Sequence, residues 1–277
     1  DSRLATLKYV ASLHDAASGG FKLNANGKPA LRPTSAAVRA WKYLDGEKLG
    51  AKFPDKDKAA AFIMSCFDPK TGGFADAPGG PTDVSITSIG VMAAVELGVP
   101  KEKFAKAMDY IKAYAKTFED VRIGAAAVEA WSVKECPFKL EPWFEVAGVY
   151  SNAGVAAAAQ DGGARETASV VAMRLRLGDS ISNGPWVLKR LNSGQRNDGG
   201  WGKAAGQSSD TETCYRVMRA YMLLKEPPAE LGHVREFLAK CRNADGGYGT
   251  SPGLPSNVAA VYHAAIISHW LDGMEKK

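Results

Sequence analysis

The stretch Asp210-Thr-Glu212-Thr-Cys214 places two carboxyl groups and a thiol close together, and His263 follows later in the chain. Carboxyl groups serve as general acids or bases, whereas Cys and His are good zinc ligands. Residues four apart share a helix face, so Asp210 and Cys214 could bind one zinc ion together with His263. The stretch is therefore compatible with a metal site, with a catalytic acid, or with the start of a helix that has no chemical role.

Two other patterns carry little chemical information. The segment Gly249-Thr-Ser251-Pro-Gly253 matches the G-x-S-x-G elbow of serine hydrolases, but that motif needs a strand-to-helix turn, which the surrounding sequence does not predict. The four cysteines show no close ligand spacing, so we expect free, mostly buried thiols. Neither pattern predicts a catalytic or metal site.

Composition and charge limit the class of protein. The chain has 277 residues, 45% of them hydrophobic, which suffices for a large core. The net charge of +5 comes with lysines scattered among acidic residues rather than with a basic block, so we expect no nucleic-acid partner. No apolar run approaches the ~20 residues of a membrane span, so we expect no such span.

The elements that must position these residues form a repeat. A Gly-Gly pair followed by an aromatic residue recurs, and an Asp or Asn stands nine residues after the aromatic in the last three copies, at 72–74, 199–201 and 246–248. Six apolar segments align behind this pattern, with starts 53, 37, 43, 47 and 47 residues apart, at 30–44, 83–97, 120–134, 163–177, 210–224 and 257–271. The period is that of a repeat protein, and each segment is predicted to be a buried helix.

A second, more amphipathic helix is predicted before each buried one. These candidates show apolar positions three to four residues apart, at 55–67, 100–118 and 227–241, with weaker versions at 2–14, 138–149 and 184–194. Six such pairs suggest two concentric rings with the apolar helices inside, and the aromatic after each glycine pair would fill the seam between repeats. An open superhelix is the alternative, because the period does not show whether the ends meet.

The repeats resemble those of the prenyltransferase and squalene-cyclase family. The stretch FIMSCFDPKTGGFADAPGGPTD (62–83) is similar to a repeat of protein geranylgeranyl transferase β subunits, and Gln195-Arg-Asn-Asp-Gly-Gly-Trp201 fits the Q-x-x-x-G-G-W form of the cyclases. The resemblance covers essentially the whole chain. It implies an all-α fold, an α/α toroid of six helix pairs around a central cavity, formed as one domain by residues 1–277.

The resemblance also implies where a zinc site would lie. Protein prenyltransferases hold zinc through an Asp, a Cys and a His, and the match at Asp120-Val121-Arg122 fixes the register. The corresponding residues here are Asp210, Glu212 in place of the Cys, and Ala260 in place of the His. We therefore expect no zinc and no other cofactor. The Asp-x-Asp-Asp acid of the cyclases is also missing from the sequence.

A zinc site built instead from Asp210, Cys214 and His263 is disfavoured by the repeat. Cys214 and His263 lie deeper in their helices than the family ligands. Cys214 also shares its position with residues that indicate packing, namely Thr34, Thr87, Gly124, Thr167 and Val261. His263 on its own is more typical of a core histidine than of a catalytic base.

A polar stripe is predicted to face the cavity. The third, seventh, tenth and fourteenth positions of the inner segments share a helix face, and together they hold seven Arg, three Glu and no Lys. Arginine suits phosphate and carboxylate groups because its planar fork makes two parallel hydrogen bonds. We predict that a ligand with such a group is held by Arg32, Arg122, Arg165, Arg216 and His263, with Asp210 and Glu212 opposite as candidate catalytic residues. The alternatives are an internal ion-pair network without a ligand and a stripe that is rotated toward the neighbouring helices.

Three functions remain open at this point. The first is an enzyme, or former enzyme, of the prenyltransferase class that binds an isoprenoid diphosphate or another anionic small molecule. The second is a non-catalytic binding or scaffold protein, for instance for a protein partner, that kept the toroid and lost the chemistry. The third and least favoured is a carbohydrate-active α/α barrel whose acid and base come from Asp210, Glu212 and Glu129.

Overall fold

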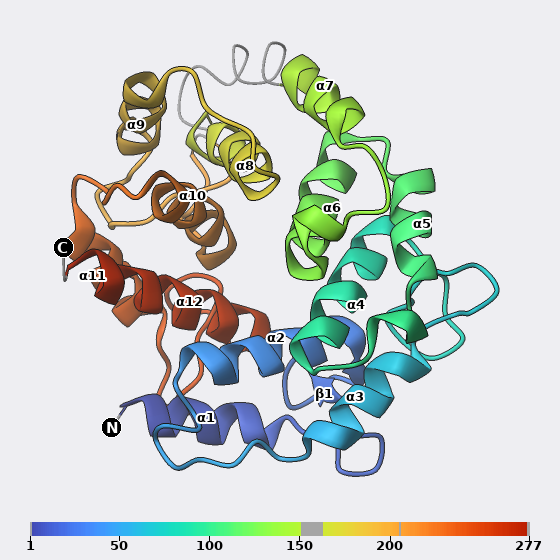
Figure 1. The fold of residues 1–277 in the computed structure, drawn as a ribbon. Coiled ribbons are helices and arrows are strands. Elements are labelled where there is room, and N and C mark those ends of the chain that lie inside the picture. The colour runs from blue at the N-terminus through green and yellow to red at the C-terminus, as the bar shows by residue number, and fades with distance from the viewer. Residues whose placement is uncertain (1, 151–162, 205, 276–277) are drawn as a thin grey trace.

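The computed structural model describes residues 2–150, 163–204 and 206–275, whose helices form a ring (Figure 1). These residues hold one short hairpin, in which β1 (Phe21–Lys22) pairs antiparallel with β2 (Pro29–Ala30). The α-helices of the described chain are α1 (Ser2–Ser12), α2 (Leu31–Tyr43), α3 (Lys56–Ser65), α4 (Val84–Glu96), α5 (Lys106–Tyr114), α6 (Phe118–Trp131), α7 (Glu141–Tyr150), α8 (Gly163–Arg176), α9 (Gly184–Ser193), α10 (Thr211–Leu224), α11 (Leu231–Cys241) and α12 (Val258–Met274). They make up the six predicted helix pairs.

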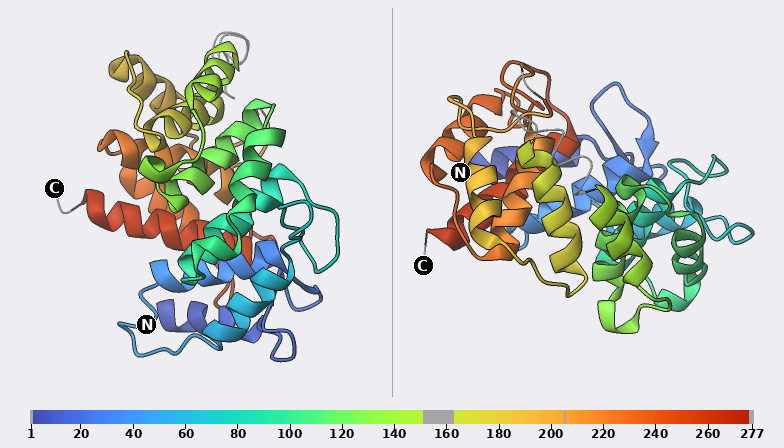
Figure 2. Two further views of the ribbon diagram at one scale, coloured as in Figure 1. Left: turned by 45° about the vertical axis from the view of Figure 1, so that its right-hand side comes forward. Right: turned by 90° about the horizontal axis from the view of Figure 1, so that it is seen from above.

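The even-numbered helices form an inner ring that closes on itself. Each packs against the next, from α2 through α4, α6, α8 and α10 to α12, and α12 packs back against α2. The odd-numbered helices lie outside them in Figure 1, and Figure 2 shows the same arrangement from two further sides. The first helix, α1, contacts the last, α12. The closed ring confirms the α/α toroid and excludes the open superhelix.

The inner helices begin where the sequence places a capping residue. Asp83, Asp210 and Asn257 are the N-caps of α4, α10 and α12, and each side chain accepts the backbone N–H three residues later. An N-cap of this kind satisfies one of the backbone donors that the first helical turn leaves without a partner. The Asp or Asn nine residues after each aromatic is thus the signal that starts the helix.

One inner helix begins earlier than predicted. The repeat places the start of this segment at Asp120, but α6 starts at Phe118, with Thr117 as its N-cap. The Thr117 side chain accepts the Asp120 N–H, and the Asp120 carboxylate accepts the Thr117 N–H. This reciprocal capping box places the N-cap three residues before the aspartate and the helix start two residues before it.

One outer helix is shorter than predicted. Residues 100–118 were expected to form one helix, but a 3-10 turn at Lys101–Lys103 precedes α5. Between them Phe104 is fully buried and packs edge-on against Trp131. The helix is thus interrupted at a residue whose ring is buried in the core, and burial of such a ring stabilises the fold.

The glycine pairs join neighbouring repeats. The first glycine of four pairs has a left-handed backbone, with φ between +81° and +92° at Gly19, Gly72, Gly199 and Gly246. A Cβ at any of these positions would lie within 3.0 Å of an atom of the next outer helix. At Gly246 that helix is α1, so the last repeat joins the first by the same contact as the others. The aromatics Phe21, Phe74 and Trp201 that follow are fully buried, as the predicted seam requires.

Cys214 helps to hold the aromatic residue that follows the glycine pair of its repeat. The Thr34 hydroxyl accepts the Phe21 backbone N–H at 2.9 Å, and Thr87 accepts that of Phe74 at 3.0 Å. In the α10 repeat the Cys214 sulfur accepts the Trp201 N–H at 3.3 Å. The packing role predicted for this position is confirmed, and burial raises the pKa of the Cys214 thiol. All four cysteines are free thiols.

No helix within the described ranges is long and apolar enough to cross a membrane. The hydrophobic core fills the space between the two rings, where Val217 of α10 and Phe237 of α11 are both fully buried.

Ser251, of the G-x-S-x-G match, lies in the loop before α12, and its hydroxyl donates to the Ser209 carbonyl at 2.7 Å. It has no nearby strand-to-helix turn of the kind that a hydrolase elbow needs.

Candidate functional site

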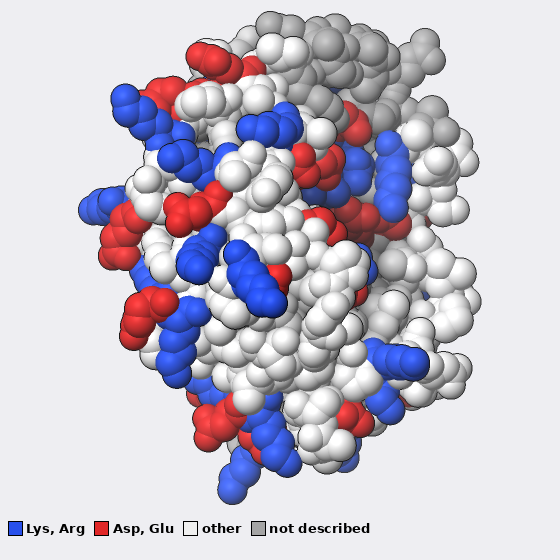
Figure 3. Space-filling model, turned by 90° about the vertical axis from the view of Figure 1, so that its right-hand side faces the viewer, with Lys and Arg blue, Asp and Glu red and all other residues white. Residues whose placement is uncertain are grey.

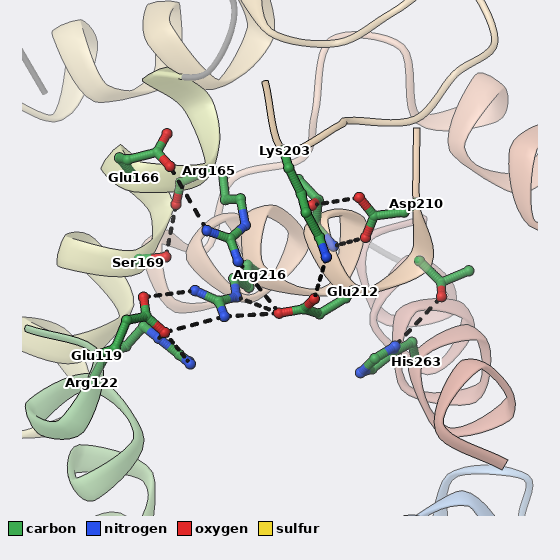
Figure 4. A network of polar contacts seen from close by, with 12 residues as sticks. Glu119, Arg122, Arg165, Glu166, Ser169, Lys203, Asp210, Glu212, Arg216 and His263 are labelled. Carbon is green, nitrogen blue, oxygen red and sulfur yellow. Dashed lines mark hydrogen bonds and ion pairs between the residues drawn. The ribbon is translucent and has the colours of Figure 1, made fainter. Parts of the chain in front are cut away.

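The polar residues predicted to face the lumen fall into two groups. The first, which we call the rim cluster, lies at the start of three neighbouring inner helices and the loop before α10 (Figure 4). It consists of Glu119 and Arg122 of α6, Arg165 and Glu166 of α8, Lys203 of the loop, and Glu212 and Arg216 of α10. Four cations and three carboxylates meet here.

Glu212 is the centre of the rim cluster. Its carboxylate lies 2.8 Å from an Arg216 nitrogen, 3.5 Å from an Arg165 nitrogen and 3.4 Å from the Lys203 nitrogen. Burial opposes ionisation of this carboxyl, but Arg216 and Arg165 outweigh burial and lower the pKa of Glu212 to about 2. One carboxylate is therefore shared by three cations.

Glu119 connects α6 to the same network. It lies 2.9 Å from Arg122 and 3.0 Å from Arg216. Burial would raise the pKa of Glu119, yet the two arginines lower it. The third carboxylate, Glu166, has a longer contact, at 3.8 Å from an Arg165 nitrogen, and burial raises the pKa of Glu166. Figure 4 shows the chain of contacts running from α6 across α10 to α8.

Three of the predicted site residues do not belong to the rim cluster. Arg32 is apart from the rim cluster, since two nitrogens of its exposed side chain donate to the Asp76 Oδ2 at 2.8 and 3.0 Å. The Asp210 carboxylate accepts the Thr213 N–H and hydroxyl, both at 2.8 Å, and so serves as the cap of α10. His263 lies 3.5 Å from the Thr211 hydroxyl, and burial lowers the pKa of His263 to about 4. His263 is therefore neutral at pH 7.

The second group, which we call the deep cluster, lies further along the inner helices. Its members are Arg39, Arg176, Arg219, Tyr215, Tyr262 and Trp270. The guanidinium of Arg219 lies 4.5 Å from the centre of the Trp270 ring, and that of Arg39 lies 4.7 Å from the Tyr262 ring. The Tyr215 hydroxyl is 3.2 Å from Arg219 and 3.3 Å from the Tyr262 hydroxyl. Arg39 and Arg219 thus meet aromatic faces rather than carboxylates, whereas Arg176 lies 3.2 Å from the Glu129 carboxylate.

Tyr215 and Tyr262 also face the lumen, although the predicted polar stripe does not include them. Both occupy the sixth position of their inner segments, one residue before the expected stripe. The signal that could have found them is the recurrence of Tyr at that position in two neighbouring repeats. Arg39, Arg176 and Arg219 were expected in the stripe, but their separation from the rim cluster was not.

The cavity between these helices is small. Arg122, Ser169, Ala172, Met173, Arg176, Tyr215, Arg216 and Arg219 line a space of about 20 Å³. A space of this size holds about one water molecule. Larger hollows lie outside the inner ring, such as one of about 350 Å³ beside Trp41 and Phe53. On the face shown in Figure 3, acidic and basic side chains are interspersed.

Comparison with known families and proteins gives a match at the family level. Residues 38–113 and 105–276 match the family described as the prenyltransferase alpha-alpha toroid domain. These two ranges include all the residues of the rim and deep clusters. No curated protein matches the chain.

Several solved structures share the fold. A protein from Actinoplanes is 12% identical, with a TM-score of 0.58 and coverage of 99% of this chain and 98% of that chain. A variant of the type II terpene cyclase MstE from Scytonema, in complex with its product merosterolic acid A, is 11% identical, with a TM-score of 0.55 and coverage of 98% and 95%. Protein geranylgeranyltransferase-I from Candida albicans, complexed with GGPP, is 15% identical, with a TM-score of 0.33 and coverage of 95% and 59%. At these identities the first two structures show a common fold and nothing finer.

Proposed function

The chain belongs to the prenyltransferase α/α toroid family, and we propose that its rim cluster binds the anionic head of an isoprenoid-diphosphate-like ligand. The observation that supports this proposal most is the sharing of Glu212 by Arg165, Lys203 and Arg216. Three cations from two inner helices and a loop converge on one negative group. A phosphate or diphosphate carries more charge and more acceptor oxygens than a carboxylate, so it can satisfy the same donors at once.

The balance of charge at the rim also favours an anion. Arg122, Arg165, Lys203 and Arg216 contribute four positive charges against the three carboxyl groups of the rim cluster. Glu166 offsets them least, because its pKa is raised by burial. Arginine forks that are already held in place lose little freedom when a ligand binds, which favours binding.

We infer that Glu212 holds the cations in position until the ligand arrives. Its low pKa keeps this carboxylate ionised at pH 7, so it is not suited to donate a proton. Asp210 is occupied by the cap of α10. The catalytic role predicted for both residues stays a prediction, and the geometry supports binding more than proton transfer. The capping role of Asp210 and the ionised state of Glu212 also argue against an acid and base pair that acts on carbohydrates.

The zinc chemistry of protein prenyltransferases does not fit these residues. At the corresponding positions, Asp210 accepts two hydrogen bonds at the helix start, and Glu212 is surrounded by cations that would repel Zn²⁺. Ala260 offers no ligand atom, and the Cys214 sulfur is fully buried against Trp201. We therefore propose a mode of binding that does not involve zinc at this position.

The small cavity favours a second candidate within the same proposal, a non-catalytic binding protein. A space of about 20 Å³ below the rim cannot hold an isoprenoid chain. The hydrocarbon part of a ligand would therefore lie outside this part of the lumen. Such an arrangement would leave the anionic head as the main recognition element.

Titration calorimetry with inorganic diphosphate and farnesyl diphosphate tests this function. We expect saturable binding of both compounds, weakened about tenfold or more in Arg216→Gln, because a charge-assisted hydrogen bond is worth about 1.5–3 kcal/mol. Arg32→Gln is the matched control, since Arg32 also pairs with a carboxylate but lies apart from the rim cluster. Absence of binding by the folded wild type, or equal weakening in the control, would contradict the proposal.

A further inference from the structure

The deep cluster contains more positive charge than its contacts neutralise. Arg39 of α2, Arg176 of α8 and Arg219 of α10 carry three positive charges. The carboxylate that contacts them within the described residues is Glu129 of α6, 3.2 Å from the Nε of Arg176. These four residues together carry a net charge of +2. Charges inside a protein need a counter-charge or water, because burial alone is strongly unfavourable.

Two of these arginines are almost fully buried and incompletely satisfied. Arg176 and Arg219 are 9% and 7% exposed. The Nε–H of Arg219 has no hydrogen-bond acceptor within the described part of the chain. The Nε of Arg176 lies 3.2 Å from the Glu129 carboxylate, but it forms no hydrogen bond within the described residues. Aromatic faces attract the cations, yet they do not satisfy these in-plane donors.

The same arginines line the small cavity. Arg176 and Arg219 lie on its wall together with Arg122, Arg216 and Tyr215. The wall thus carries four guanidinium groups and no carboxylate side chain. A space of about 20 Å³ accommodates a single atom or ion of roughly the size of water. It is too small for a phosphate group.

We propose that this cavity is a binding site for a small monovalent anion of the halide class, held by Arg176 and Arg219. The anion would accept hydrogen bonds from the buried guanidinium groups and neutralise part of their charge. The cavity wall also includes Arg122 and Arg216 of the rim cluster, but the anion is held by Arg176 and Arg219, so the site does not depend on the function proposed for the rim. Its role is to stabilise the closed inner ring where α8 and α10 meet.

An ionised Tyr215 is the competing source of negative charge. Burial raises the pKa of Tyr215, but Arg219, Arg176 and Arg39 lower it well below its usual value. The charged and titratable groups near this phenol are Arg39 of α2, Arg122 and Glu129 of α6, Arg176 of α8, Arg219 of α10, and Tyr262 and His263 of α12. A halide and a phenolate would compete for the same guanidinium groups, so a phenolate at Tyr215 would argue against a bound halide.

Thermal unfolding in sodium chloride and sodium isethionate at equal ionic strength tests the site. Isethionate is too large for the cavity. For the wild type we expect a saturable increase in Tm of about 2–4 °C with chloride, as a ligand that binds only the folded state produces. Arg219→Gln should abolish the dependence on chloride. Arg235→Gln should retain it, because Arg235 forms exposed ion pairs with Asp272 and Glu275.

Two further measurements keep the proposal falsifiable if Arg219→Gln fails to fold. Crystals grown with bromide should show its anomalous signal between Arg176 and Arg219. The near-ultraviolet spectrum should show no phenolate band at pH 7 that Tyr215→Phe removes. A chloride-independent Tm in the wild type, absence of bromide from the cavity, or a phenolate band from Tyr215 would each overturn the proposal. Diphosphate binding at the rim would be unaffected by any of these results.

Discussion

The rim cluster and the deep cluster use the same inner helices but neutralise their arginines in different ways. At the rim, Glu119 and Glu212 each contact at least two cations, and the side chains of both remain partly accessible to water. In the deep cluster, Arg219 instead faces the rings of Trp270 and Tyr215. A few residues further along the same helix, the partner of an arginine changes from a carboxylate to an aromatic face.

This contrast indicates which arginines a ligand can reach. A carboxylate near solvent can move aside at small cost, because water compensates for the lost contact. A cation buried among aromatic rings has no such freedom. We therefore assign exchangeable binding to the rim cluster and a structural role, with at most a small ion, to the deep cluster.

The largest expected effect concerns His263, whose ring stacks on Tyr215 beside the deep cluster. Burial lowers the pKa of His263 to about 4, from 6.5. The unfolded chain therefore binds a proton between these values while the folded protein does not, so stability falls as the pH drops from about 6.5 to 4. Urea unfolding should show that His263→Gln removes up to about 3 kcal/mol of this loss.

The exposed His233 provides the control for that prediction. His233→Gln should leave the pH dependence of unfolding close to that of the wild type. An unchanged decline in His263→Gln would show that His263 is protonated in the folded protein. The deep cluster would then carry even more positive charge than its arginines provide.

The second prediction breaks the charge balance of the rim. Glu212→Gln leaves Arg165, Lys203 and Arg216 without their shared carboxylate, so we expect a loss of about 1–2 kcal/mol at pH 7, after allowing for solvent screening. Because the pKa of Glu212 is lowered to about 2, its contribution is complete above about pH 4.5 and disappears as the pH falls through about 2. Chemical unfolding at several pH values measures this.

The same variant should bind inorganic diphosphate more tightly. Removing the competing carboxylate frees three donors, and we expect an increase of about tenfold in affinity by calorimetry. The exposed Glu236, replaced by Gln, is the control and should change neither stability nor affinity. Weaker binding in Glu212→Gln would mean that Glu212 is needed to shape the site rather than to occupy it.

The third prediction is that removing an arginine from the deep cluster raises stability, whereas removing one from the rim lowers it. Arg219→Met replaces a buried, incompletely satisfied cation by an apolar side chain, which is often neutral or stabilising. We expect a gain of about 1 kcal/mol in chloride-free buffer, measured by urea unfolding. The matched Arg216→Met at the rim should instead lose stability, because Glu119 and Glu212 would each lose a partner. A large loss in Arg219→Met would show that its charge is already compensated.

The smallest effect is expected on the opposite face of α10. Cys214→Thr supplies the hydroxyl that Thr34 and Thr87 provide at the same position of their repeats, so stability should change by less than about 0.5 kcal/mol. Diphosphate binding should be unchanged. Cys214→Val, which leaves the Trp201 N–H without its acceptor, should cost about 1 kcal/mol. A loss of binding in Cys214→Thr would link this face to the rim.

Much of the fold was predictable because local signals agree with it. The glycine pairs, the capping Asp or Asn and the apolar segments recur with the same spacing, and each acts over a few residues. The start of α6 was predicted wrongly because Thr117 and Asp120 form a capping box, in which the aspartate is not the cap. The break before α5 was missed because it depends on the burial of Phe104 against Trp131.

The candidate site was predictable only in part. Helical periodicity placed Arg122, Arg165, Glu212 and Arg216 on lumen faces, and the structure brings them together. It also placed Arg32 there, but Asp76, from the loop of the next repeat, draws that side chain away. A periodic pattern describes one helix at a time and contains no information about such a partner.

The sequence by itself determined that the chain forms six helix pairs and that arginines gather on the inner helices, because both follow from local composition and period. The closure of the ring, the division of the arginines into two clusters and the small cavity between α8 and α10 were decided by tertiary structure. The physical reason is that burial and charge neutralisation depend on which side chains of neighbouring helices meet, and these contacts join residues far apart in the chain.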